Sequence, residues 1–263
     1  MTCGTVEIPA TVPHVFVEES SLMHSLSTRT NTATPHQSAL LPRLPQPAFW
    51  GLWVTILSLA VLAIGVVASH SPQFTSEEFT VDQELSKSHV GVLTGLVMVL
   101  DRAFSPVGGV VMIGLVCLFL WLFRTSFVNA LAFGGVASAG WLSSQLFKVI
   151  VARQRPNPAL LIDPLSPETG STSFPSGHVA LAVGLAWAFY FLLRKTHWAR
   201  PVMVLAVVVP LVVAWSRIYV GVHYPSDVIA SFLAASAGVM LFVGVWNLFR
   251  GAGDATAATH PSV

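Results

Sequence analysis

Six apolar stretches recur in this chain, and each approaches the roughly 20 residues that a helix needs to cross the hydrocarbon core of a bilayer. Their interiors contain no Asp, Glu, Lys, Arg or His. The whole sequence is 54% hydrophobic and only 10% charged, whereas soluble domains carry about 25% charged residues. We therefore expect an all-α fold, a six-transmembrane helical bundle. The stretches lie at 49–69, 107–123, 127–147, 178–193, 201–218 and 227–249.

The absence of ionisable groups inside the stretches argues against an ion pump or a proton-coupled carrier, because these need such a group at mid-membrane depth. A net charge of +1 with few, clustered cations excludes a nucleic-acid partner. Cys3 lies in a polar region and Cys117 in an apolar stretch, so no disulfide is expected. A further apolar run at 90–100 is too short to span, and its charged flanks predict an interfacial helix.

The two ends of the chain are polar. Residues 1–47 are rich in Ser, Thr, Pro and His, lack hydrophobic periodicity and do not resemble a signal peptide, so we expect a disordered N-terminal tail. Met23 is an alternative start, and the sequence does not decide between it and Met1. Residues 251–263 are expected to form a short C-terminal tail. The membrane domain is therefore expected at 48–250.

Positive charges predict the orientation, since Lys and Arg favour the cytoplasmic side. If the N-terminus is cytoplasmic, seven Lys and Arg residues lie on the cytoplasmic side and six on the external side. Three of the six external residues belong to the motifs described below, and without them the counts are seven and three. Both termini are then cytoplasmic, and the motifs open on the external side. The inside cations are Arg29, Arg43, Arg124, Arg194, Lys195, Arg200 and Arg250; the outside ones are Lys87, Arg102, Lys148, Arg153, Arg155 and Arg217.

Small residues recur at every fourth position in the fourth and sixth stretches. This spacing lets helices pack closely in lipid, and packing within one molecule is favoured over a dimer seam. The oligomeric state stays open. The positions are Ala180, Gly184 and Ala188, and Ala230, Ala234 and Gly238.

The first motif, KVIVARQRP (148–156), closes the third stretch. Because a proline disfavours helix in the residue before it, the helix should end near Ala152. Lys148 and Arg155 then reach one site from a helix end and a loop, as fixed charges suited to phosphate oxygens. Lys148 alone would indicate only snorkelling to the interface. For Arg153, snorkelling or a contact with a lipid headgroup is at least as good an interpretation as catalysis.

The second motif, PSGH (175–178), opens the fourth stretch. Ser176 is a natural N-cap, and Gly177 permits close approach of the backbone to a ligand. Free N–H groups at a helix start bind anions. His178 can move protons near neutral pH, although a lone histidine here is more often interfacial than catalytic.

The third motif, SRIYVGVHYPSD (216–227), joins the last two stretches. Arg217 adds a third cation. His223 precedes the helix that the proline starts, and Asp227 lies in its first turn, close enough to orient the histidine ring. An Asp there also complements the helix dipole. Tyr219 and Tyr224 are expected to be interfacial anchors.

These motifs together resemble the type 2 phosphatidic acid phosphatase superfamily, which also contains bacterial acid phosphatases, vanadium haloperoxidases and glucose-6-phosphatase. The family signature is Lys-x6-Arg-Pro, Pro-Ser-Gly-His and Ser-Arg-x5-His-x3-Asp, and this chain carries all three elements with the same internal spacing. The resemblance covers about 48–250. It implies His223 as the nucleophile, Asp227 as its partner and His178 as the acid/base. It implies as phosphate ligands Lys148, Arg155, Ser176, Gly177 and Arg217.

The expected function is hydrolysis of a lipid phosphate or diphosphate through a phosphohistidine, without a metal or other cofactor. Three converging cations would repel a divalent metal held by two histidines and an aspartate. A vanadate haloperoxidase fits poorly with six spans, and a non-enzymatic scramblase or channel fits poorly with an intact His and Asp set. A lipid phosphotransferase stays open. So does the substrate, which the motifs do not distinguish among undecaprenyl diphosphate, phosphatidic acid, phosphatidylglycerol phosphate and a prenyl-linked sugar phosphate.

Overall fold

The computed structural model describes residues 1–2, 43–165 and 171–259, with the backbone alone for 250–259. The chain divides into residues 1–38 and 39–263, and the fold below is that of the second unit. Its described part is helical, with one isolated bridge between Gln154 and Thr172. The helices are α2 (Trp50–His70), α3 (Pro72–Ser86), α4 (Gly91–Ala103), α5 (Pro106–Leu122), α6 (Phe127–Val151), η2 (Pro158–Leu160), α7 (Gly177–Leu193), α8 (Ala199–Tyr219) and α9 (Pro225–Thr259).

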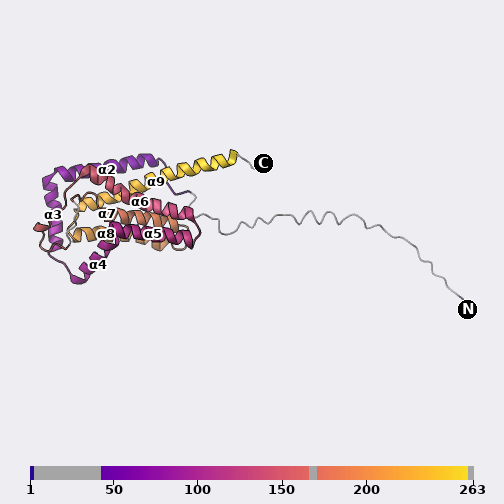
Figure 1. Ribbon diagram of the computed structural model, residues 1–263, viewed down its shortest axis with the longest axis horizontal. Helices are drawn as coiled ribbons and strands as arrows, with labels where there is room; N and C mark the ends of the chain where they lie inside the picture. The colour runs from indigo at the N-terminus through magenta and orange to yellow at the C-terminus, as the bar shows by residue number, and fades with distance from the viewer. Residues whose placement is uncertain (3–42, 166–170, 260–263) are drawn as a thin grey trace. The chain divides into compact units, whose positions relative to one another are not determined.

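Each of the six predicted stretches is one helix, namely α2 and α5 to α9, and these helices run roughly side by side (Figure 1). By length and composition, α2, α8 and residues 225–249 of α9 are able to cross a membrane. The α4 and α5 helices meet this criterion only as a pair bent by 66°. Among the described residues, three helices therefore meet the criterion for a membrane span, or four if the bent pair counts as one span.

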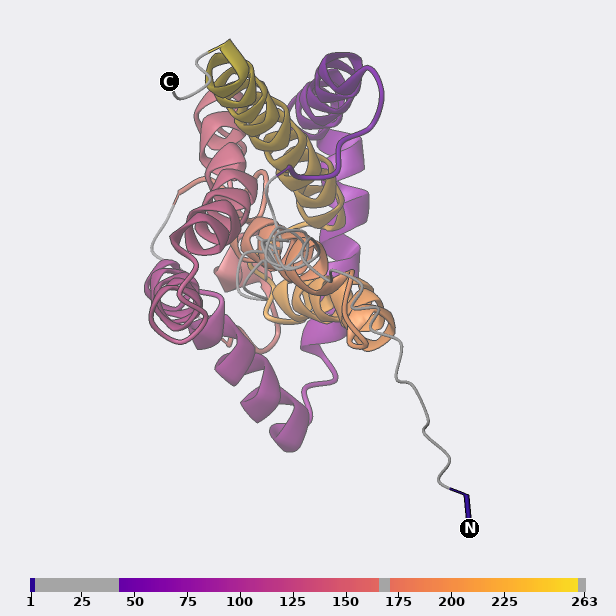
Figure 2. The same ribbon diagram turned by 90° about the vertical axis from the view of Figure 1, so that its right-hand side faces the viewer.

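The α6 and α7 helices form the centre of the bundle, and small residues let them approach closely. A Cβ atom added at Gly184 would lie 2.6 Å from the Ala137 carbonyl oxygen, so α7 packs there directly on the α6 backbone. Ala180 and Ala188 on the same stripe are buried. The stripe on α9 is also buried: Ala230 and Ala234 pack with α2, and Gly238 approaches α6. Figure 2 shows α9 beside α2. Both stripes therefore serve packing within one molecule.

Large apolar side chains are exposed along the outer faces of the bundle, as expected where lipid is the solvent. On α2 they include Leu52, Ile56 and Leu59, and on α8 they include Val204, Val207 and Leu211.

Two helices lie at the end of the bundle where the motifs are found (Figure 1). The α3 helix was not anticipated as an element; its start is capped by the Ser71 hydroxyl, which accepts a hydrogen bond from Phe74 N, and Pro72 occupies its first turn. The run at 90–100 does form a helix, α4, which is followed by α5 at a bend of 66°; by length and composition the two together could form a broken span or a re-entrant segment.

The described structure continues past residues 48 and 250 at both ends. Leu44 is buried, and its N–H and carbonyl both bond to the side chain of Asn247 on α9, so the chain joins the bundle before residue 48. Residues 3–42 of the predicted N-terminal tail, with Cys3 and Met23, lie outside the described residues. At the other end, the expected tail continues α9 as helix to Thr259.

Candidate active site

The three motifs meet at one end of the bundle because each lies at a helix end. Lys148 is in the last turn of α6. The helix ends where Ala152 adopts a left-handed conformation, close to the end that Pro156 predicted. The bridge between Gln154 and Thr172 then ties the loop after α6 to the segment that leads into α7. Arg217 is in the last turn of α8, and Asp227 is in the first turn of α9.

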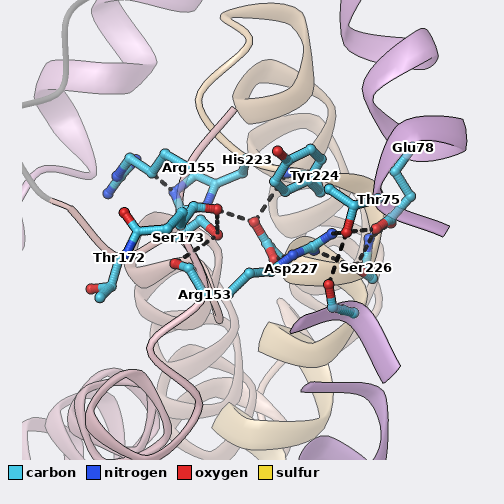
Figure 3. Close-up of polar contacts among 12 residues, drawn as sticks. Thr75, Glu78, Arg153, Arg155, Thr172, Ser173, His223, Tyr224, Ser226 and Asp227 are labelled. Atoms are coloured by element: carbon cyan, nitrogen blue, oxygen red, sulfur yellow. Dashed lines mark hydrogen bonds and ion pairs between the residues drawn. The ribbon is translucent and has the colours of Figure 1, made fainter. Parts of the chain in front are cut away.

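His223 lies in the turn between α8 and α9 and is buried, 1% exposed. Its Nδ1 is 3.5 Å from Asp227 Oδ2, and that oxygen also accepts a hydrogen bond from Tyr224 N at 3.0 Å. On the other side of the ring, Arg155 Nη1 lies 3.5 Å from His223 Nε2 and donates to the Val222 carbonyl oxygen at 3.1 Å (Figure 3). A cation facing Nε2 favours the neutral tautomer that carries its proton on Nδ1, toward Asp227.

The pKa of His223 lies well below its usual value of 6.5. Burial is the main cause, because it disfavours the charged ring. The positive charges of the surrounding motif residues lower it further, in the order Arg155, Arg217, Lys148 and His178. The three predicted cations and His178 therefore act on one imidazole and favour its neutral form.

Lys148, Ser176 and Gly177 lie at the neighbouring ends of α6 and α7. Lys148 Nζ donates to the carbonyl oxygens of Thr172 and Ser173 at 3.2 and 3.4 Å. Ser176 precedes α7 as predicted, but its hydroxyl does not cap the helix; it is buried and has no hydrogen-bond partner within the described residues. At Gly177, an added Cβ would meet Gln145 Nε2 at 3.6 Å, an ordinary contact, so packing within the protein does not demand glycine there.

Asp101, at the end of α4, is a member of the site that the motifs do not include. Its carboxylate pairs with Arg217, and its Oδ1 lies 3.5 Å from His178 Nε2. Its carbonyl oxygen also contacts that nitrogen at 3.2 Å, which favours a proton on His178 Nε2. A charged residue ending an apolar run was the only signal for it in the sequence.

Of the interpretations open for Arg153, snorkelling and a contact with a lipid headgroup do not fit the structure, because the side chain is buried. The side chain is 4% exposed and bridges two carboxylates: Nη1 is 2.9 Å from Asp227 Oδ1, and Nη2 is 2.8 Å from Glu78 Oε2 on α3 (Figure 3). Its guanidinium also stacks 3.9 Å from the centre of the Tyr224 ring. Glu78 was missed because no local pattern links α3 to the motifs.

The interfacial role expected for the two tyrosines is also wrong, since both are buried. Tyr219 Oη accepts a hydrogen bond from Val90 N at 3.0 Å and bonds to Thr94 Oγ1, fastening α8 to the start of α4. Tyr224 lies beneath Arg153. Their hydroxyl and ring contacts fix the helices that carry the site.

Within the part of the chain that the structure describes, no three His, Cys, Asp or Glu side chains are arranged to hold a metal ion. The arrangement instead presents a neutral, buried imidazole between a carboxylate and a group of cations. Such a site can bind an anion and offer it a nitrogen nucleophile.

Comparison with known proteins agrees with this geometry. The family model described as the PAP2 superfamily matches residues 125–250. Undecaprenyl-diphosphatase BcrC of Bacillus subtilis (strain 168) is 32% identical over 143 residues, which cover 54% of this chain and 71% of that protein. An undecaprenyl-diphosphatase of Sulfolobus acidocaldarius is 29% identical, covering 70% and 85%.

The fold is similar to the crystal structure of a transmembrane PAP2 type phosphatidylglycerolphosphate phosphatase from Bacillus subtilis. The TM-score is 0.63 at 22% sequence identity, and the match covers 73% of this chain and 94% of that one. With its three motifs gathered at one end of a bundle of apolar helices, the chain belongs to the PAP2 superfamily, in its membrane lipid phosphatase branch.

Proposed function

We propose that this protein is an integral membrane phosphatase that hydrolyses a lipid phosphate or diphosphate through a phosphohistidine intermediate. The observation that carries the proposal is the neutral imidazole of His223, buried among Arg155, Arg217, Lys148 and His178 at the end of an apolar bundle. Undecaprenyl diphosphate is the foremost candidate substrate, because the two relatives described above are undecaprenyl-diphosphatases. Phosphatidic acid and phosphatidylglycerol phosphate are the next candidates.

In the first chemical step, His223 Nε2 attacks phosphorus in line with the leaving oxygen. The bond from phosphorus to that oxygen breaks, and protonated His178 donates a proton to it. The ring of His223 becomes positively charged, and Asp227, 3.5 Å from Nδ1, stabilises this charge. Contacts of this kind are often long before substrate binds and shorten in the reacting complex.

In the second step, His178 removes a proton from water, the water oxygen bonds to phosphorus, and the bond from phosphorus to His223 breaks. Inorganic phosphate leaves and both histidines return to their starting states. Asp101 supports this cycle by contacting His178 Nε2, which directs the other ring nitrogen toward the proton transfers.

The phosphoryl oxygens are held by Lys148, Arg155, Arg217 and the backbone N–H of Gly177, where α7 begins. Two local features favour a ligand at this helix start. The Ser176 hydroxyl is buried with no partner among the residues described, and glycine at 177 is not required by internal packing. The hydroxyl of Ser176 can donate a hydrogen bond to a phosphoryl oxygen, and the missing side chain at Gly177 lets that oxygen approach the backbone closely.

We further propose six crossings: α2, the bent pair of α4 and α5, α6, α7, α8 and α9. The 25 residues of α6 and the 17 of α7 give lengths of about 37 and 26 Å, near the bilayer core thickness of about 30 Å. Six crossings put both termini on one side, and the positive charges place that side in the cytoplasm. The membrane domain is then 48–250 with Leu44 anchored to it, and the site opens externally.

The test is phosphate release by the purified, detergent-solubilised protein from a panel of lipids containing undecaprenyl diphosphate, phosphatidic acid and phosphatidylglycerol phosphate. Release from at least one of them is expected in the absence of any acceptor lipid. A protein that moves phosphate only to a second lipid is a phosphotransferase, and one that acts on none of these lipids contradicts the proposal. His223→Ala protein, prepared in parallel, measures contaminating phosphatase.

A further inference from the structure

The α3 helix carries none of the three motifs, yet it places two carboxylates beside the site. Glu78 is 8% exposed and Asp82 is fully buried, one turn further along the same face of the helix. Buried carboxylates are costly unless they are paired or hydrogen-bonded. Glu78 is held by several partners, which Figure 3 shows together with Arg153 and Asp227.

Glu78 contacts the residue that precedes Asp227 in the chain. Its Oε1 accepts a hydrogen bond from Ser226 N at 2.6 Å, and its Oε2 accepts one from Ser226 Oγ at 2.9 Å. An anion at the first N–H groups of a helix satisfies donors that have no partner within the helix. Glu78 thereby fixes the start of α9, and with it the position from which Asp227 projects.

Arg153 connects Glu78 to Asp227 itself. Its two terminal nitrogens donate to Glu78 Oε2 at 2.8 Å and to Asp227 Oδ1 at 2.9 Å, while Tyr224 packs against the guanidinium plane. The other Asp227 oxygen, Oδ2, faces His223 Nδ1. Both oxygens of the aspartate are thus engaged, and the carboxylate has little freedom to turn away from the histidine.

The charges of this group explain why a second carboxylate is needed. Arg153 and Asp227 alone form a neutral pair, which would offer little stabilisation to an imidazolium. Adding the Glu78 carboxylate to the pair leaves one net negative charge behind His223. In a buried site such a charge acts strongly on a cation that forms nearby.

We propose that Glu78 and Arg153 form a positioning pair, which orients Asp227 toward His223 and keeps net negative charge behind the ring when it is phosphorylated. The inference rests on the proposed function, since it concerns the same nucleophile. Neither side chain is expected to touch the substrate; both act through Asp227.

The first test is the steady-state kinetics of Glu78→Gln on whichever lipid the wild type hydrolyses. Glutamine keeps the shape and a hydrogen-bond acceptor but removes the charge. We expect kcat to fall about tenfold or more, as for other residues that orient a reacting group through a neighbour, with KM little changed because the phosphate-binding cations are untouched. The matched control is Glu77→Gln, which removes the same charge from an exposed position where the carboxylate accepts a hydrogen bond from Gln73.

The second test is a double-mutant cycle with Asp227→Asn. If Glu78 acts through Asp227, adding Glu78→Gln to Asp227→Asn costs little more activity, because the two losses are not additive. A separate structural role would multiply the two losses. Arg153→Lys keeps the positive charge but cannot bridge both carboxylates as a guanidinium does. It should also lower kcat, and its loss should likewise be non-additive with that of Asp227→Asn. This variant replaces Glu78→Gln in the cycle if Glu78→Gln does not fold.

The outcomes separate the two proposals. If the wild type is active and both Glu78→Gln and Arg153→Lys have the same kcat as the control Glu77→Gln, the positioning pair is overturned. The proposed function is then still supported. Multiplicative losses in the cycle overturn the positioning pair as well. A wild type that hydrolyses none of the lipids overturns both.

Discussion

His223 and Asp227 face each other across the start of α9, with Nδ1 of the ring 3.5 Å from Oδ2 of the carboxylate. Arg155 lies on the opposite side of the same ring, 3.5 Å from Nε2, and Arg217, Lys148 and His178 add to its effect in lowering the pKa of His223. This division between negative charge behind the nucleophile and positive charge in front of it underlies the following predictions.

The pH dependence of kcat/KM should show an acid limb below pH 6.5. The unprotonated ring is the nucleophile, and burial followed by the nearby cations lowers the pKa of His223, so the reactive form persists as the pH falls. In Arg155→Gln, the largest of the charge effects is removed, so the limb should move to higher pH. The same variant should lose kcat/KM on the order of 10²-fold, as for a lost oxyanion donor.

The matched control is Lys87→Gln, which removes a cation that is paired with Glu84 on the protein surface. Its limb should stay at the wild-type position. An acid limb that does not move in Arg155→Gln would show that the titrating group is not His223.

Asp82→Asn should stabilise the protein increasingly as the pH rises from about 4 to about 8. Both Asp82 carboxylate oxygens are buried with no hydrogen-bond partner among the described residues. Burial first, then the charges of Asp227 and Glu78, raise the pKa of Asp82 to about 8. Between the unfolded value of about 3.9 and 8, the unfolded chain has lost this proton while the folded protein retains it, so wild-type stability falls with rising pH by up to about 1.4 kcal/mol per pH unit.

Thermal midpoints of the detergent-solubilised wild type and variant, measured across that range, check this. The two should agree near pH 4 and diverge by pH 8. Glu77→Gln, on the exposed face of α3, should follow the wild type throughout. A constant difference at every pH would mean that Asp82 is ionised in the folded protein.

Activity should persist in EDTA and should be inhibited by vanadate. The described site offers cations and a histidine nucleophile to the phosphoryl group, and vanadate resembles that group during transfer. Rates measured before and after EDTA treatment, and again with added Mg²⁺, provide the check. Activity that EDTA abolishes and a divalent ion restores would contradict the proposed chemistry.

A cysteine at Ser171 should react with an impermeant maleimide on intact cells, and one at His197 should not. Both positions are exposed, and they lie just before and just after α7, so a membrane-spanning α7 puts them on opposite sides. The background should lack Cys3 and Cys117. The reverse labelling pattern would place the site in the cytoplasm and remove the reason for preferring an external carrier lipid.

The sequence predicted well the helices whose long apolar runs are suited to contact with lipid. The starts of α2 and α5 to α9 fall within two residues of those expected, because a long apolar run has few alternatives in a membrane. Their polar ends also had to meet at one face, which brought His178, His223 and Asp227 together. The span expected at 227–249 matches the membrane-crossing part of α9, Pro225–Phe249, and the alanines and glycines after residue 250 continue the helix without being apolar enough to extend the span.

The polar surroundings of the site were not predictable in the same way. From the sequence, Arg153 is a basic residue at a membrane boundary, and only the packing of α3 against the loop after α6 shows that it pairs with Glu78. Asp101 likewise looks like a helix flank until the fold brings it to Arg217. These contacts join residues more than 70 positions apart, where local periodicity carries no information.

The measurement that tests the account most directly is trapping of the phosphoenzyme with a ³²P-labelled lipid substrate, quenched in alkaline detergent so that an acid-labile phosphohistidine survives. The wild type should acquire an acid-labile, base-stable label on His223, Asp227→Asn should acquire it more slowly, and His223→Ala should acquire none. His178→Ala should release the label slowly. A His223→Ala protein that still becomes labelled, or a wild type that turns over substrate without any trapped label at His223, would contradict the assignment of this residue as the nucleophile.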